Sequence, residues 1–87
     1  MQKTTKLSSL EQYVVDYILK LRTERKLTQQ AIGKIIGVQA SFIGNVENKL
    51  NPSKYNLRHI QLLAKHFNLA PSGFLPSSPD QEHKKLS

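Results

Sequence analysis

Cysteine is absent from the sequence, which excludes disulfide bonds, thiolate metal ligands and a cysteine nucleophile. Long apolar runs are also absent: none approaches the roughly 20 consecutive residues that a membrane-spanning helix needs, so we expect no membrane segment. We expect no secretory signal, because residues 1–9 are polar in character and no apolar stretch follows them. The lack of cysteine fits a reducing compartment, and we expect a cytoplasmic protein.

The residue patterns of the common enzyme classes are missing as well. The sequence has no nucleophile elbow, no phosphate-binding glycine-rich loop and no paired carboxylates suited to acid–base catalysis. His59 and His66 lie roughly on one side of a predicted helix, but no Asp or Glu occurs between residues 48 and 79 to complete a metal site. We therefore expect no catalytic residue, no cofactor and no bound metal.

The basic residues are concentrated in the middle of the chain. With 87 residues the chain suffices for one small domain, and its 13 Lys and Arg against 6 Asp and Glu give a formal net charge of +7. Residues 1–19 and residues 66–87 each have equal numbers of acidic and basic side chains, so the whole excess lies in residues 20–65. A basic excess confined in this way favours a surface for a polyanion. It is equally compatible with a solvated face that only maintains solubility.

The apolar periodicity predicts an all-α fold. No sustained alternating run and no fixed-period repeat occurs, whereas apolar residues recur at steps of three and four. The pattern predicts a five-helix bundle, with helices over residues 10–25, 27–37, 39–48, a stretch capped by Asn56, and a short segment that begins at Pro71.

Cap residues mark where these helices should begin and end. We expect Ser8 or Ser9 to cap the first helix, since a Glu or Gln follows each of them three residues later. Thr28 is the expected cap of the second helix, and Gly37 is placed to end it in the left-handed conformation. The predicted inward-facing residues are Leu7, Leu10, Val14, Ile18, Leu21, Ile32, Ile35, Ile36, Val38, either Phe42 or Ile43, Val46, Leu57, Ile60, Leu63, Ala64 and Phe67, with Phe74 and Leu75 covering the core.

Composition divides the chain into three segments. Residues 1–6 have one apolar side chain and are predicted to be a flexible arm. Residues 7–76 contain the predicted helices and form the one predicted domain. Residues 77–87 are polar, with one apolar side chain, and are predicted to be a disordered tail.

Residues 32–46 have the layout of a helix-turn-helix, in which a short helix, a glycine-containing turn and a second short helix follow one another. Gly33 is small enough to let the two helices cross closely, and Gly37 tolerates the positive φ of the turn. The outward side of the second of these helices presents small or uncharged polar residues: Gln39, Ala40, Ser41, Gly44 and Asn45. Amides and hydroxyls of this kind can hydrogen-bond to base edges, which we prefer to the alternative of an ordinary solvated helix face.

The stretch from residue 21 to residue 76 resembles the five-helix DNA-binding domain of the phage repressor and Cro class, often called the Xre family. The features in register are Leu27-Thr28-Gln29 at the start of the second helix, Gly37-Val38 at the turn, Ile43 and Glu47 in the third helix, Asn51-Pro52 after it, and Leu63-Ala64 in the fourth. The resemblance implies that the third helix enters the major groove of duplex DNA.

The resemblance also implies roles for individual residues. Contacts to bases are implied for Gln39, Ala40, Ser41 and Asn45, and Gly44 beside them is expected to allow close approach to DNA. Contacts to phosphates are implied for Gln29, Asn48, Lys49 and Lys54, and the side chain of Gln29 is implied to meet the third helix as well. Arg22 and Glu47 match a buried ion pair that ties the first helix to the third. Because Lys49 stands where the family often has a glycine, we expect Asn48 to take the left-handed conformation instead.

We therefore predict a sequence-specific transcriptional regulator of the repressor or controller type, which binds duplex DNA with residues 39–48 in the major groove. Phage repressors, restriction–modification controllers and antitoxins share this architecture, so a homodimer, a protein effector and a toxin partner all stay open. One alternative is a protein-interaction or antitoxin-type module whose working surface is the end with Phe74 and Leu75, which is also the candidate dimer interface. The other is a protein that binds nucleic acid without sequence preference.

Overall fold

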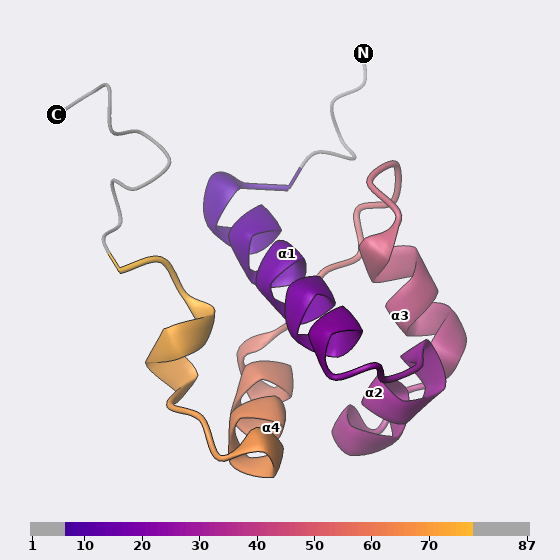
Figure 1. Cartoon of the computed structure of the whole chain (residues 1–87). Helices are drawn as coiled ribbons and strands as arrows, with labels where there is room; N and C mark the ends of the chain where they lie inside the picture. Colours follow the sequence, from indigo (N-terminus) through magenta and orange to yellow (C-terminus); the bar gives the residue numbers. More distant parts are fainter. Residues whose placement is uncertain (1–6, 78–87) are drawn as a thin grey trace, which may run out of the picture.

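The computed structural model describes residues 7–77. Its elements are α1 (Ser9–Glu24), α2 (Gln29–Ile36), α3 (Ala40–Glu47), α4 (Leu57–Phe67) and the 3₁₀ helix η2 (Pro71–Phe74). The predicted all-α class is confirmed for this part of the chain, and no helix in it has the length and apolar character that a membrane crossing requires (Figure 1). The predicted arm over residues 1–6 and the predicted tail beyond Ser77 lie outside the described residues.

The fifth helical element is a short 3₁₀ helix and not the α-helix that would complete a five-helix bundle. Pro71 occupies its first position, as predicted, and it ends at Phe74. The reason for its shortness is Pro76, because a residue that precedes proline is disfavoured in the α conformation. Leu75 accordingly has the extended angles φ −115° and ψ 155°.

Side-chain caps set the starts of α1 and α2. Of the two serines considered, Ser8 caps α1: its Oγ accepts from the backbone N–H of Glu11 at 3.1 Å, and the Glu11 carboxylate accepts from the Ser8 N–H at 3.0 Å. The predicted cap of α2 is confirmed, since Oγ1 of Thr28 accepts from the backbone N–H of Ala31 at 3.0 Å. Each such cap contributes about 1 kcal/mol to helix stability.

The helix ends agree with the predictions less uniformly. Gly37 ends α2 with φ 79°, which confirms its predicted left-handed conformation. Lys26 and Asn68 also have positive φ angles, of 57° and 58°, although neither is a glycine. The prediction for Asn48 is wrong, because its angles are φ −85° and ψ 114°. Its side-chain oxygen accepts from the backbone N–H of Leu50 at 2.9 Å instead, so the chain turns after α3 without a left-handed residue.

Every helical element contributes one fully buried side chain to the core. These are Ile18 from α1, Ile32 from α2, Ile43 from α3, Leu63 from α4 and Phe74 from η2. In Figure 1, α1 runs through the middle of the molecule, with α2 and α3 on one side and α4 and η2 on the other. The shared core therefore holds α3 in a fixed position relative to α1.

Two predicted core residues are exposed instead. Leu10 is 49% exposed and Leu57 is 78% exposed. Both lie in the first turn of their helices, where the apolar periodicity continues although no neighbouring element covers the side chain. Tyr55, in the connection between α3 and α4, is only 7% exposed. Helical periodicity gave no signal for it, because this residue belongs to no helix.

Candidate nucleic-acid interface

The close approach of α2 to the following turn depends on Gly33. A Cβ atom at this position would lie 2.6 Å from the backbone oxygen of Val38, which is too short for any side chain. The Val38 N–H donates to the carbonyl oxygen of Gly33 at 2.8 Å across the same turn. Gly33 and the left-handed Gly37 together set the direction in which α3 leaves α2, and the two helices lie side by side (Figure 1).

The residues predicted to contact bases are the N-cap residue Gln39 and residues on the outer side of α3. This recognition surface consists of Gln39, Ala40, Ser41, Gly44 and Asn45. Gln39, Ser41 and Asn45 are exposed, and none of their side chains forms a hydrogen bond with another residue in the described part of the chain. On the opposite side of α3, Ile43 and Val46 are buried in the core. The polar groups of the recognition surface are therefore available to a ligand while the core immobilises the helix behind them.

Arg22, Glu47 and Gln29 form a hydrogen-bonded network that joins three helices. The Arg22 guanidinium donates to both carboxylate oxygens of Glu47, at 2.8 and 2.9 Å, and to the carbonyl oxygen of Leu27 at 2.9 Å. The side chains of the pair are 17% and 10% exposed, so the ion pair implied by the resemblance is present and largely buried. Gln29 adds a hydrogen bond from Nε2 to Glu47 at 2.9 Å, so the contact with the third helix that the resemblance implies for its side chain is present. This network fixes the C-terminal end of α3 to α1 and α2.

The two lysines predicted to contact phosphates form ion pairs with α1. Lys54 lies 3.1 Å from the Glu11 carboxylate, and Lys49 lies 3.7 Å from that of Asp16. Hydrogen bonds, first from the backbone of Ser8 and then from Lys54, lower the pKa of Glu11. All four charged side chains of these pairs are substantially exposed. Such surface pairs contribute little stability, so each lysine can exchange its carboxylate for a phosphate at small cost.

An aromatic cluster joins α3 to α4. The ring of Phe42 packs edge-on against Tyr55 and His59, with centroid distances of 6.3 and 5.6 Å, and Tyr55 lies 5.9 Å from His59. His59 also completes a capping box, because its Nδ1 accepts from the backbone N–H of Asn56 at 3.1 Å. Burial, with a smaller contribution from Arg58, lowers the pKa of His59. The neutral imidazole packs against Phe42 and thereby helps to hold α3 against α4.

The hydroxyl group of Tyr55 is buried without a hydrogen-bond partner among the described residues. Burial is the main cause that raises the pKa of Tyr55, and the negative charge of Glu47 raises it further. The phenol consequently stays protonated, and its ring serves to fill the space between α3 and α4.

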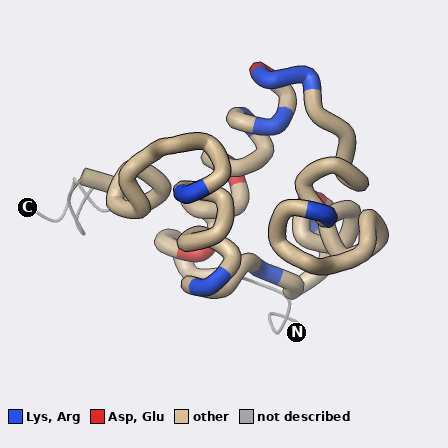
Figure 2. The backbone as a smooth tube through the Cα atoms, turned by 90° about the horizontal axis from the view of Figure 1, so that it is seen from below, with Lys and Arg blue, Asp and Glu red and all other residues tan. Residues whose placement is uncertain are grey.

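Net charge does not define a single binding face. Figure 2 shows that the Lys and Arg positions are spread over several sides of the described chain. The recognition surface itself contains no charged residue. The position of the basic residues therefore does not by itself mark the face that a polyanion would contact.

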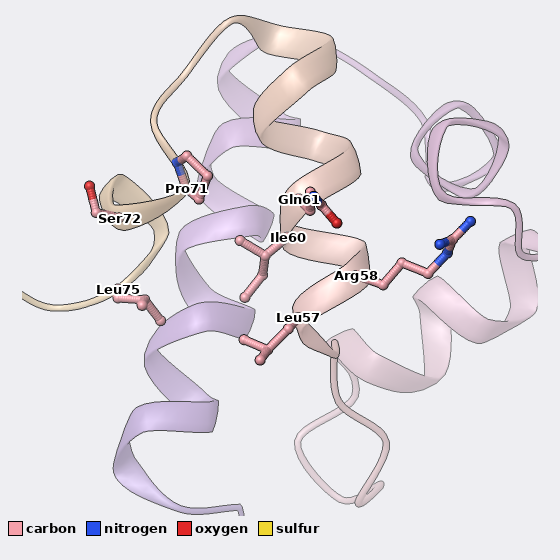
Figure 3. Close-up of a pocket in the computed structure, with 7 residues that line it drawn as sticks. All are labelled: Leu57, Arg58, Ile60, Gln61, Pro71, Ser72 and Leu75. Carbon is pink, nitrogen blue, oxygen red and sulfur yellow. The ribbon is translucent and has the colours of Figure 1, made fainter.

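A separate apolar surface lies between α4 and η2. An open pocket of about 570 Å³ is lined there by Leu57, Arg58, Ile60, Gln61, Pro71, Ser72 and Leu75 (Figure 3). A neighbouring pocket of about 460 Å³ shares Leu57, Ile60 and Leu75 with it and extends to Leu10. Phe74 is 0% exposed, which confirms its predicted role in covering the core and excludes it from the alternative contact surface.

Comparison with known proteins agrees with this geometry. Residues 18–74 match the helix-turn-helix family HTH_3, whereas no curated protein matches the chain. The crystal structure of the hypothetical transcription factor NHTF from Neisseria is similar in fold, with 24% sequence identity and a TM-score of 0.58 over 98% of this chain and 100% of that chain. Because the family match covers more than half of the chain, including all of α2 and α3, the protein belongs to the Xre/Cro-like helix-turn-helix family of DNA-binding transcription regulators.

Proposed function

We propose that the protein is a sequence-specific regulator of the repressor or controller type, which inserts α3 into the major groove of duplex DNA. The observation that carries this proposal is the recognition surface: exposed, unpaired amide and hydroxyl groups stand on a helix that is immobilised by the core and by the Arg22–Glu47 pair. Base contacts would come from Gln39, Ser41 and Asn45 through hydrogen bonds. Ala40 would contact a thymine methyl group, and Gly44 would permit close approach.

Contacts to phosphates would supply much of the affinity. In this proposal Lys49 and Lys54 exchange their carboxylate partners for phosphates, and Asn48 contacts the backbone beside them. Affinity should then fall as salt rises, because each neutralised phosphate releases a counterion. The anchoring of the Gln29 amide on Glu47 favours a different role for that residue.

A second copy of the chain would double the number of base contacts. The pocket between α4 and η2 supports this proposal, because it places the 78%-exposed Leu57 beside an apolar groove. In a two-fold dimer each Leu57 would enter the groove of the other copy, and the DNA site would be palindromic. Sedimentation of the wild-type protein and of Leu57→Asp would test this, with a loss of dimers expected for the variant. A wild-type protein that is monomeric both free and on DNA would contradict it.

Selection of bound sequences from random duplex DNA, at two salt concentrations, tests the regulator proposal. The wild-type protein should enrich a short motif that persists at the higher salt. A triple Ala variant at Gln39, Ser41 and Asn45 should lose the motif and keep weak, salt-sensitive binding. His66→Ala, on an exposed position of α4, is the control and should retain the motif. Binding by the wild-type protein that enriches no sequence would refute specific recognition.

The exposure of Leu57 and Leu10 favours one alternative, a protein-interaction or antitoxin-type module in the cytoplasm. A toxin or effector protein would then cover the apolar surface, and the recognition surface would be dispensable. Leu57→Asp and the triple Ala variant at Gln39, Ser41 and Asn45 separate the two functions. Loss of regulation in the cell with Leu57→Asp but not with the triple Ala variant would support the module.

A further inference from the structure

The side-chain amide of Gln29 has a fixed orientation. Its Nε2 donates to Oε1 of Glu47 at 2.9 Å, and the Glu47 carboxylate also accepts two hydrogen bonds from Arg22. An ionised carboxylate can only accept, so the NH₂ group of Gln29 must face Glu47 and its carbonyl oxygen must face away. The chemistry of the partner therefore settles which end of the amide points outward.

This amide lies against α3 at Gly44, the only residue of the recognition surface without a side chain. A Cβ atom built at Gly44 would lie 3.4 Å from Oε1 of Gln29 and 3.8 Å from its Nε2. Gly44 follows Ala40 by one helical turn and therefore lies on the same side of α3. Gln29, although it belongs to α2, thus places its amide within the recognition surface.

One edge of the Gln29 amide forms no hydrogen bond within residues 7–77. Within residues 7–77, Oε1 of Gln29 accepts no hydrogen bond, and the only buried side-chain nitrogen or oxygen without a partner is the Tyr55 hydroxyl. Because Gln29 is half-buried and its oxygen is unpaired, that oxygen must reach the surface. Nε2 has two hydrogens and gives one to Glu47, so a donor and an acceptor remain side by side.

We propose that Gln29 is a specificity-determining residue that recognises an adenine in the major groove. Adenine presents an N7 acceptor beside an N6 donor, which complements the free edge of an amide. A phosphate has acceptors only, so it would use the remaining N–H and bring negative oxygens toward Oε1. The inference rests on the proposed function, and it replaces the phosphate contact that the family resemblance implies for this residue.

Arg22 and Glu47 act as positioning residues in this arrangement. Their bidentate pair fixes the carboxylate, and the carboxylate fixes the amide plane of Gln29. A recognition group that is held before binding loses less conformational entropy on contact with DNA.

The test compares DNA motifs selected by the wild-type protein, Gln29→Ala and the matched control Gln30→Ala. Gln30 is the adjacent, exposed glutamine of α2, and its side chain forms no hydrogen bond within the described residues. Gln29→Ala should lose one adenine position of the motif and retain the others, with roughly 5- to 150-fold weaker binding to the wild-type site. Gln30→Ala should retain the full motif. Gly44→Ala, whose methyl group presses on the amide, should weaken the same adenine position.

A DNA substitution gives a second measurement that does not depend on how a variant folds. Replacing that adenine by 7-deazaadenine removes the N7 acceptor and should weaken binding of the wild-type protein but not of Gln29→Ala. A uniform loss of affinity over all sequences in Gln29→Ala would identify a phosphate contact and overturn the inference. A motif with unchanged adenine preference in Gln29→Ala would overturn it as well. Failure of the wild-type protein to select any motif would instead refute the proposed function, and this inference with it.

Discussion

The Arg22–Glu47 pair can be removed one partner at a time or as a unit, and the two changes should have different consequences. The side chains are 17% and 10% exposed, so each charge loses most of its hydration on folding. Glu47→Leu would withdraw two of the three hydrogen bonds of Arg22 and leave only the one to Leu27. We expect the free energy of unfolding to fall by about 3 kcal/mol, the lower end for a broken buried pair, because Arg22 keeps some access to water.

The double variant Arg22→Met/Glu47→Leu removes both charges, so neither is left unpaired. Its free energy of unfolding should lie within about 1 kcal/mol of that of the wild-type protein. Arg22→Met alone should cost about as much as Glu47→Leu, because the carboxylate would retain only Gln29. Urea unfolding followed by circular dichroism measures all four proteins and closes a double-mutant cycle. Additive losses in the double variant would refute the view that an unpaired buried charge dominates the cost.

The same double variant separates stability from recognition. Its fold should be restored, yet Gln29 has lost the acceptor that orients its amide. We therefore expect the preference for adenine at the Gln29 position to weaken in a protein whose melting temperature is close to that of the wild type. An unchanged preference in this variant would show that Glu47 supports α3 without positioning Gln29.

Three further changes test the local structure. Lys26→Gly should stabilise the protein by about 1 kcal/mol, because Lys26 has φ 57° and a side chain is unfavourable at such a left-handed angle. Unchanged or lower stability of this variant in urea would contradict the expectation. Gly33→Ala should cost about 1–3 kcal/mol, because its methyl group would meet the backbone oxygen of Val38 at 2.6 Å; a thermal melt equal to that of the wild type would show that the turn can shift freely. Stability should also fall as pH drops below about 6.5, because the folded protein, with the lowered pKa of His59, binds that proton less readily than the unfolded chain. In His59→Gln, which keeps an acceptor for Asn56 but does not titrate, melts from neutral to acidic pH should show a smaller decrease, and an equal decrease would exclude His59 as the source.

Features that depend on local chemistry could be predicted from the sequence. Thr28 caps α2 because its hydroxyl group reaches a backbone N–H three residues later. Gly37 takes a left-handed angle because the turn after α2 demands it. The Arg22–Glu47 pair was found through family resemblance, since no local pattern joins two residues on different helices.

Features that depend on which elements meet in space could not be predicted in this way. Leu57 continues the apolar pattern of α4 but lies where no other element covers it. Lys54 and Glu11 form a pair only because the connection before α4 passes the start of α1. Lys26 gave no signal, because neither charge nor hydropathy reports a backbone angle.

The proposed role of Gln29 would show why a family role cannot be transferred from one position alone. A glutamine at the start of the second helix is implied to contact a phosphate, but the direction of its amide depends on what α3 offers beside it. Here Glu47 provides the acceptor and Gly44 provides the space, so the amide lies on the recognition surface. A larger residue at position 44 would exclude the amide from that surface and supply a recognition group of its own. In this proposal the identity of residue 44 decides whether the DNA contact at this point comes from α3 or from α2, and the two positions should be interpreted together.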